Sequence, residues 1–136
     1  MKLTILLFAT ALFGADKVTY VEHDKIANAL AKGGAVVKQS DLIVQGGHRE
    51  KTGEVEVHDK ETDVIYVVDG EATFVTGGNL VNGKETGPGQ TRAPQMTGGE
   101  SHHLVKGDVI VVPAGTSHWF KEVPKSISYY VVKVLR

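Results

Sequence analysis

From residue 34 onward, the chain is a succession of short apolar runs separated by turn-forming residues. The runs are rich in valine, isoleucine, tyrosine and phenylalanine, residues that favour β-strands. Sixteen glycines provide for the tight turns between them. Strands at this short spacing predict a β-sandwich or barrel, and closing the sheet as a jelly roll would hide its edges. The predicted strands include residues 36–37, 42–44, 54–58, 64–68, 71–75, 102–105, 109–112 and 128–135.

Three other stretches have patterns of their own. Residues 22–32 predict one short helix, because apolar residues fall at helical spacing and Gly33-Gly34 ends the run. Asp69-Gly70 is the strongest hairpin signal, and residues 106–108 predict a second hairpin. Residues 76–99 are rich in Gly, Pro, Thr and Asn and predict a long loop, either a lid over a site or a surface insertion.

The N-terminus resembles a secretory signal peptide. Lys2 precedes an apolar stretch of eleven residues, and the small residues Gly14-Ala15 follow it. The stretch is shorter than the ~20 apolar residues that span a bilayer. We therefore expect a signal peptide over residues 1–15, one domain over residues 16–136, and an exported protein, periplasmic or secreted, with no membrane anchor in its mature form. The alternative is a buried N-terminal strand or helix.

Composition excludes several classes of function. A chain of 136 residues suits one domain with a real core. Its formal net charge of −1 provides no basic field for nucleic acid or for an anionic membrane. The absence of cysteine excludes thiolate catalysis and cysteine-ligated metal centres.

Two segments combine possible metal ligands with turn-forming residues. Glu56 and His58 lie two apart on a predicted strand and therefore share one face, and Asp63 begins the next strand. An acid and an imidazole that both point into a barrel are costly unless they are paired or bound to something. In the second segment, His118 follows the turn at residues 113–115. Alone it would suit a hydrogen-bonded core histidine, but the first segment gives it partners.

The spacing of these segments resembles the two motifs of the cupin superfamily. The first motif runs Gly-x5-His-x-His-x3,4-Glu-x6-Gly, and the second runs Gly-x5-Pro-x-Gly-x2-His-x3-Asn. The resemblance covers roughly residues 40–135. The matching positions are His58, Asp63 and Gly70 in the first motif and Gly107, Pro113, Gly115 and His118 in the second.

The chain also departs from both motifs. Glu56 stands where the first histidine is usual, and Asp63 stands where the glutamate is usual. Glu50 replaces the first glycine and Glu122 the final asparagine. Family members typically hold one metal ion with three histidines and one glutamate. By position, this chain would offer Glu56, His58, Asp63 and His118.

The resemblance implies an all-β double-stranded β-helix, or jelly-roll barrel, with a short N-terminal helix. It also implies one divalent transition metal ion per chain (Fe, Mn, Ni or Zn) and a homodimer; the alternative is a metal-free cupin. The expected function is a metal-dependent enzyme, dioxygenase-like or an isomerase or lyase, acting on a small polar or aromatic molecule. The alternative function is a non-catalytic module that binds a small molecule.

Two further residues are candidates for a catalytic role. His102 shares a face with Leu104 and is predicted to point into the barrel, as a fifth ligand, an acid/base group or a residue that orients a ligand. Arg49 would meet an anionic substrate if it faces the barrel mouth; otherwise it is the solvated end of a strand.

Overall fold

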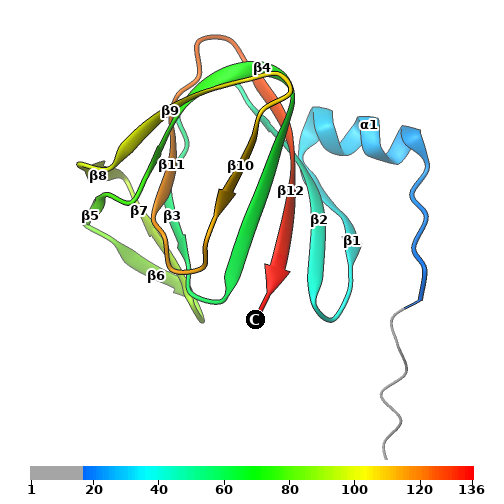
Figure 1. Ribbon diagram of the computed structural model, residues 1–136, viewed down its shortest axis with the longest axis horizontal. Helices are drawn as coiled ribbons and strands as arrows, with labels where there is room; N and C mark the ends of the chain where they lie inside the picture. Colours follow the sequence, from blue (N-terminus) through cyan, green and yellow to red (C-terminus); the bar gives the residue numbers. More distant parts are fainter. Residues whose placement is uncertain (1–16) are drawn as a thin grey trace, which may run out of the picture.

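The computed structural model describes residues 17–136, so the expected signal peptide at residues 1–15 lies outside the described residues. One helix precedes a series of strands (Figure 1). No helix in residues 17–136 is long and apolar enough to cross a membrane. The elements are α1 (His23–Lys32), β1 (Gly34–Lys38), β2 (Leu42–Arg49), β3 (Val55–His58), β4 (Glu61–Thr76), β5 (Asn79–Val81), β6 (Lys84–Gly87), β7 (Gln90–Ala93), β8 (Gln95–Thr97), β9 (Glu100–Val105), β10 (Val109–Val112), β11 (His118–Glu122) and β12 (Ile127–Leu135).

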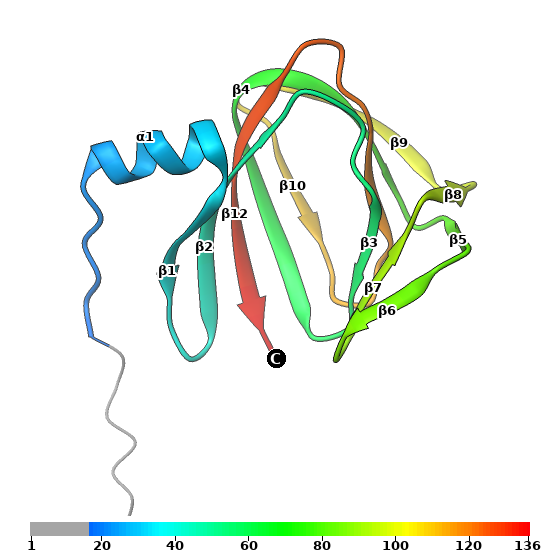
Figure 2. The same ribbon diagram turned by 180° about the vertical axis from the view of Figure 1, so that it is seen from behind.

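The strands form one curled antiparallel sheet in the order β1-β2-β12-β4-β11-β3-β7-β6, with β9 and β10 also paired to β4. Strands β5 and β8 form a separate small ribbon. Figures 1 and 2 show how the sheet curls, with β12, β4 and β10 on one side and β11, β3 and β7 on the other. The predicted double-stranded β-helix with a short N-terminal helix is therefore confirmed.

Strand β4 belongs to both sides of the barrel. Residues 61–69 pair with β12, whereas residues 71–76 pair with β9. The predicted hairpin at Asp69-Gly70 is wrong, because the strand bends there and continues. Gly70 has a φ of 80°, and a Cβ at this position would overlap the carbonyl oxygen of Ser126. Glycine is needed here because the backbone is left-handed and lies close to Ser126, as it would in a turn. At this position, however, the glycine lets β4 pass from one side of the barrel to the other.

The second predicted hairpin is also wrong. Strands β9 and β10 do not pair with each other; both run antiparallel to β4, β9 along its second half and β10 along its first. Between them, the Asp108 carboxylate accepts a hydrogen bond from the Val105 amide, and the Gly107 amide donates to the carbonyl of Val67. A turn does form at residues 106–108, but it joins two strands, β9 and β10, that pair one after the other along β4.

Residues 76–99, predicted as a loop, contain β5, β6, β7 and β8. Strand β7 pairs with β3 over four positions, from Val55 with Ala93 to His58 with Gln90. The segment thus extends the sheet and forms one wall of the barrel interior. Its other two strands, β5 and β8, form the separate small ribbon.

Aromatic side chains fill the centre of the barrel. Phe74, which is fully buried, meets Phe120 edge to face at 4.7 Å, and Phe120 stacks on Tyr129 at 4.8 Å. The ring of His118 lies 5.9 Å from Phe74. These contacts close one end of the interior and leave polar side chains of β3 and β4 beside a packed aromatic wall.

We expect Gly70→Ala to lower the free energy of unfolding by about 3 kcal/mol or more, because strain at positive φ adds to steric overlap. Urea unfolding followed by the fluorescence of Trp119 measures the change. Gly87→Ala is the matched control, since its φ is not positive and a Cβ there meets no atom within 4 Å. Its effect should stay within about 0.5 kcal/mol. Equal effects of the two substitutions would refute the role given to Gly70.

Candidate metal-binding site

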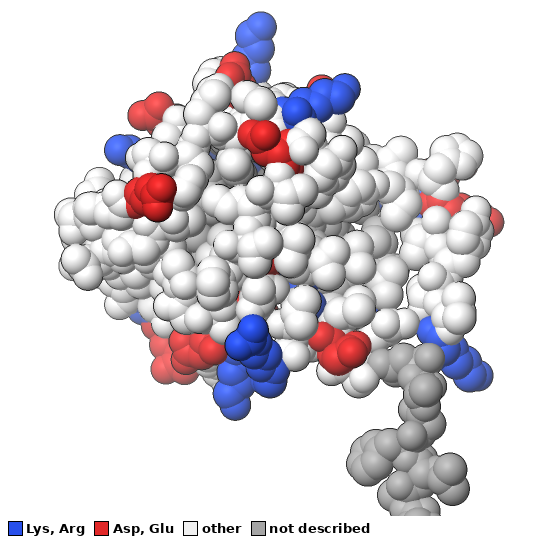
Figure 3. All heavy atoms as spheres, in the orientation of Figure 1, with Lys and Arg blue, Asp and Glu red and all other residues white. Residues whose placement is uncertain are grey.

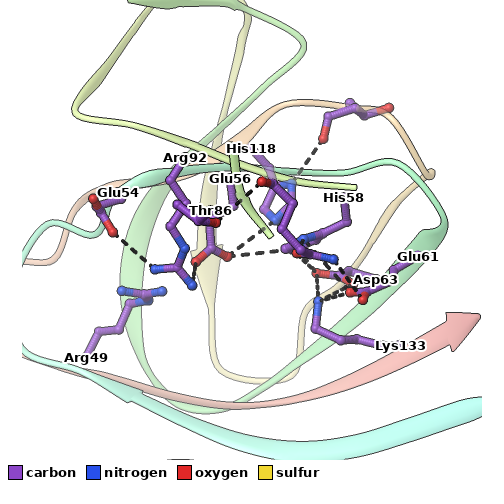
Figure 4. A network of polar contacts seen from close by, with 12 residues as sticks. Arg49, Glu54, Glu56, His58, Glu61, Asp63, Thr86, Arg92, His118 and Lys133 are labelled. Atoms are coloured by element: carbon purple, nitrogen blue, oxygen red, sulfur yellow. Dashed lines mark hydrogen bonds and ion pairs between the residues drawn. The ribbon is translucent and has the colours of Figure 1, made fainter. Parts of the chain in front are cut away.

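Four predicted ligands from three strands meet inside the barrel (Figure 4). Glu56 and His58 lie on one face of β3, and His118 on β11 is the cross-strand partner of Glu56. Asp63 follows the turn that connects β3 to β4. His58 Nε2 lies 3.7 Å from Glu56 Oε2 and 3.6 Å from Asp63 Oδ2. His118 Nε2 lies 3.9 Å and 3.7 Å from the same two oxygens.

The second nitrogen of each histidine has a partner that fixes its tautomer. His58 Nδ1 donates to Oε1 of Gln90, and His118 Nδ1 donates to the carbonyl of Thr116 at 3.1 Å. Both Nε2 atoms then carry lone pairs that point toward the carboxylates. His58 Nε2 is buried and has no hydrogen-bond partner. Burial lowers the pKa of His118, although Thr116 and Asp63 oppose that effect, so its imidazole is neutral at pH 7.

Each carboxylate has one oxygen that faces the histidines, and each is paired with a cation. Lys133 Nζ donates to Asp63 Oδ1 at 2.9 Å and to Oδ2 at 3.1 Å, and Oδ2 also faces both histidines. Glu56 Oε1 pairs with Arg92 at 3.1 Å, while Oε2 faces the histidines. The cations therefore orient both acids toward the same point, as partners of metal-ligating carboxylates do.

Two overlapping sets of side chains could hold a transition metal ion: Glu56, His58 and His118, and His58, Glu61 and Asp63, each with ligand atoms within 4.8 Å of one another. Ligand atoms held ~2.1 Å from a tetrahedral ion lie ~3.4 Å apart. The four separations between a histidine Nε2 and a carboxylate oxygen are 3.6 to 3.9 Å, a few tenths of an ångström above that value. Two imidazoles with two carboxylates suit divalent iron, manganese, nickel or zinc. A buried imidazole nitrogen without a partner is the kind of atom that an ion would satisfy.

Lys133 and Glu61 were not predicted. Lys133 Nζ lies 3.0 Å from Glu61 as well as against Asp63. Burial alone would lower the pKa of Lys133, but the two carboxylates outweigh it and raise that pKa. Burial would raise the pKa of Glu61, but Lys133 lowers it overall, so the pair is charged. The alternation of side chains along β12 could have indicated that Lys133 points into the barrel, because Tyr129 and Val131 lie on the same face of the strand and are buried.

Gln90 and Arg92 were also missed. Both belong to β7, within the stretch that composition assigns to a loop. Their cross-strand partners on β3 are His58 and Glu56, the two residues that they hold. Only the pairing of β7 with β3 reveals them, and no local pattern in the sequence predicts that pairing.

The ligand cluster lines a cavity of about 500 Å³. Arg49 lies on the cavity wall, which corresponds to the first of its two expected positions rather than to a solvated strand end, and its Nε donates to the Tyr129 hydroxyl at 3.0 Å. The structure does not bring His102 to the cluster. His102 pairs with Thr76 at 3.1 Å and lines a separate cavity of about 240 Å³ beside β10.

The fold recurs in solved structures of low sequence identity. BH2720 from Bacillus halodurans has a TM-score of 0.62 at 15% identity, over 91% of this chain and 85% of that one. A Klebsiella pneumoniae protein with a double-stranded β-helix domain has a TM-score of 0.52 at 20% identity, over 74% and 73%. The DMSP lyase DddQ from Ruegeria pomeroyi has a TM-score of 0.54 at 13% identity, over 75% of this chain but only 45% of the lyase. These likenesses concern the fold alone.

The search of curated proteins finds no match to this sequence. The family model described as Cupin matches residues 14–134, which is nearly the whole chain. That match includes both motif segments and every strand of the barrel except the last residue of β12. The chain belongs to the cupin family.

Proposed function

We propose that this cupin is a metal-dependent enzyme that acts on a small polar or aromatic molecule. The observation that carries the proposal is that two imidazole nitrogens and two carboxylate oxygens face one another inside the barrel. One of these nitrogens, His58 Nε2, is buried and has no hydrogen-bond partner. Buried polar atoms without partners are rare in stable folds and mark functional positions. The ion would be one divalent transition metal ion per chain, held by Glu56, His58, Asp63 and His118.

The bound ion would supply a Lewis acid or redox centre that holds the oxygen atoms of a substrate. The chain supplies the rest. Gln90 and Thr116 keep both imidazoles in the ligating tautomer, and Lys133 and Arg92 orient the carboxylates. Ile65, Phe120 and Val131 form an apolar wall beside the cluster. Oxygen insertion is the first reaction class we propose, and isomerase or lyase chemistry the next; the DMSP lyase DddQ shares this fold.

Lys133 supports a second candidate, a non-catalytic cupin that binds a small molecule without metal. Its ammonium pairs with both Asp63 and Glu61, so each of these acids has a cation partner without an ion. In that case the cavity alone would hold the ligand. Metal content separates the two candidates directly.

Protein purified without added metal should contain about one transition metal ion per chain, or take one up on titration. His58→Ala and His118→Ala should each lower the affinity for the ion by at least tenfold, because each removes a ligand whose nitrogen faces the centre. Elemental analysis gives the stoichiometry, and isothermal titration calorimetry gives the affinity.

His103→Ala serves as the control for these variants. His103 lies on an exposed part of β9, paired with Glu71 at 3.1 Å, and its loss should leave metal binding unchanged. If the wild-type protein binds well under one ion per chain in both experiments, the metal-dependent function is wrong and the binding module is favoured.

Lys133→Met should make stability depend on metal. Without an ion, the substitution leaves Asp63 and Glu61 without their cation and should cost about 3 kcal/mol of unfolding free energy. Added Zn²⁺ or Mn²⁺ should restore most of that loss. Thermal unfolding with EDTA and with the ion measures both effects. An equal loss under both conditions would mean that no ion replaces the lysine charge.

The outer face of the barrel supports a homodimer. On β10, β4 and β12, most of the residues that point away from the core are apolar, and cross-strand pairs join them in rows. Val109 is 59% exposed, Val111 55% and Tyr66 45%. Figure 3 shows the middle of this face free of charged side chains, which gather along its margins. The rows are Val111-Val64-Val132-Val44 and Val109-Tyr66-Tyr130.

We propose that a second copy of the chain covers this face, because an uncharged patch can pair with itself about a two-fold axis. Val111→Glu should convert a dimer into a monomer, as measured by size-exclusion chromatography with light scattering. Val18→Glu is the control, since Val18 is 99% exposed and lies outside the face. A wild-type protein that is monomeric at high concentration would refute the dimer.

A further inference from the structure

Arg49 is a cation on the cavity wall that the ligand cluster does not use. Arg92 pairs with Glu56 and Glu54, and Lys133 pairs with Asp63 and Glu61. Arg49 lines the same cavity, but within residues 17–136 it forms no ion pair with a carboxylate. Figure 4 draws no interaction between the Arg49 guanidinium and an acid. A guanidinium that has no carboxylate partner and lies beside a cavity is suited to bind an anionic group of a ligand.

The position of Arg49 is fixed by other contacts. Its Nε donates to the Tyr129 hydroxyl at 3.0 Å, and its guanidinium carbon lies 5.0 Å from the centre of the Phe120 ring. Both partners belong to the aromatic core, so the guanidinium is held by rigid elements. Nε is used in this arrangement, whereas the two terminal nitrogens remain available to donate in parallel.

Tyr129 provides a second donor at the same place. Burial raises the pKa of its hydroxyl, and the nearby Arg49 opposes but does not cancel that effect, so the group is protonated at neutral pH. Because the oxygen already accepts from Arg49, its proton is free for an acceptor in the cavity.

We propose that Arg49 and Tyr129 form a subsite for the carboxylate of a small, singly charged ligand whose body lies between this subsite and the ligand cluster. The inference deepens the proposed function, on which it rests for the claim that the ligand is a substrate. Binding of the anion itself needs only the two side chains.

The surroundings favour a carboxylate over other anions. The two terminal nitrogens of a guanidinium match the two oxygens of a carboxylate in a bidentate pair. A phosphate dianion would bring two negative charges beside Glu56, Asp63 and Glu61, and the Arg49 guanidinium provides only one positive charge to meet them. Ile65, Phe120 and Val131 line the same cavity and would pack against an apolar body.

Benzoate and benzamide are suitable probes, because they share a ring and differ in the carboxylate. In protein treated with EDTA, benzoate should bind saturably by isothermal titration calorimetry, with benzamide and inorganic phosphate at least tenfold weaker. Arg49→Met should weaken benzoate by at least tenfold, and Arg49→Lys should restore only part of that loss, since an ammonium lacks the fork. Tyr129→Phe should weaken benzoate by roughly three- to tenfold while leaving the ring packing intact.

Lys38→Met is the matched control. Lys38 lies at the rim of the same cavity, is exposed, and its substitution removes the same unit charge. It should change benzoate affinity by less than twofold. The subsite is refuted if benzoate does not bind, if benzamide or phosphate binds equally well, or if Lys38→Met has the larger effect. Circular dichroism of each variant checks that loss of binding is not loss of fold.

The same titrations separate this inference from the proposed function. If no ion binds but benzoate still requires Arg49, the metal-dependent function fails and the carboxylate subsite stands. If an ion binds and Arg49→Met leaves benzoate affinity unchanged in both the EDTA-treated and the metal-loaded protein, the subsite fails and the metal centre stands.

Discussion

The structure depends on how it compensates carboxylates inside a barrel. Asp63 is 3% exposed, and a buried charge of this kind costs several kcal/mol unless it is paired and hydrogen-bonded. Lys133 on β12 and Arg92 on β7 provide the cations, one from each side of the cavity. The pairing of these strands thus serves two purposes. It completes the sheet, and it brings the charges that allow an acid-rich centre to exist in a folded chain.

Strand β4 connects this centre to the hydrophobic core. Its first half carries Asp63, and its second half carries the fully buried Phe74, which packs against Phe120 and lies near His118. Because the strand crosses between the two sides at Gly70, one continuous element fixes both the acid and the aromatic wall. Strand β11 likewise fixes the position of His118, which is the cross-strand partner of Glu56 on β3 and of Thr76 on β4. The geometry of the centre therefore follows from the register of the sheet.

The sequence predicted the elements whose signals are local. Helix α1, the jelly roll and the grouping of Glu56, His58, Asp63 and His118 follow from periodicity, turn residues and motif spacing. Pairing was harder to predict. Asp69-Gly70 carries the residues of a hairpin, but β12 and β9 are available as partners, so the strand continues instead of folding back. Gln90 and Arg92 reach His58 and Glu56 only because β7 pairs with β3, and that pairing depends on the closed sheet. His102 does point inward, but the barrel places it at another opening.

The charge of the centre explains how its departures from the family motif can be tolerated. Glu56, Glu61 and Asp63 carry three negative charges, and Arg92 and Lys133 carry two positive ones, which leaves one net negative charge on these five side chains. A set of three histidines and one glutamate has the same net charge. Lys133 bonds to Asp63 Oδ1 at 2.9 Å and to Oδ2 at 3.1 Å, and Oδ2 also faces the histidines, so an ion bound there would share that oxygen with the lysine. Arg49 remains the cation with a free fork to direct an anionic ligand toward the centre.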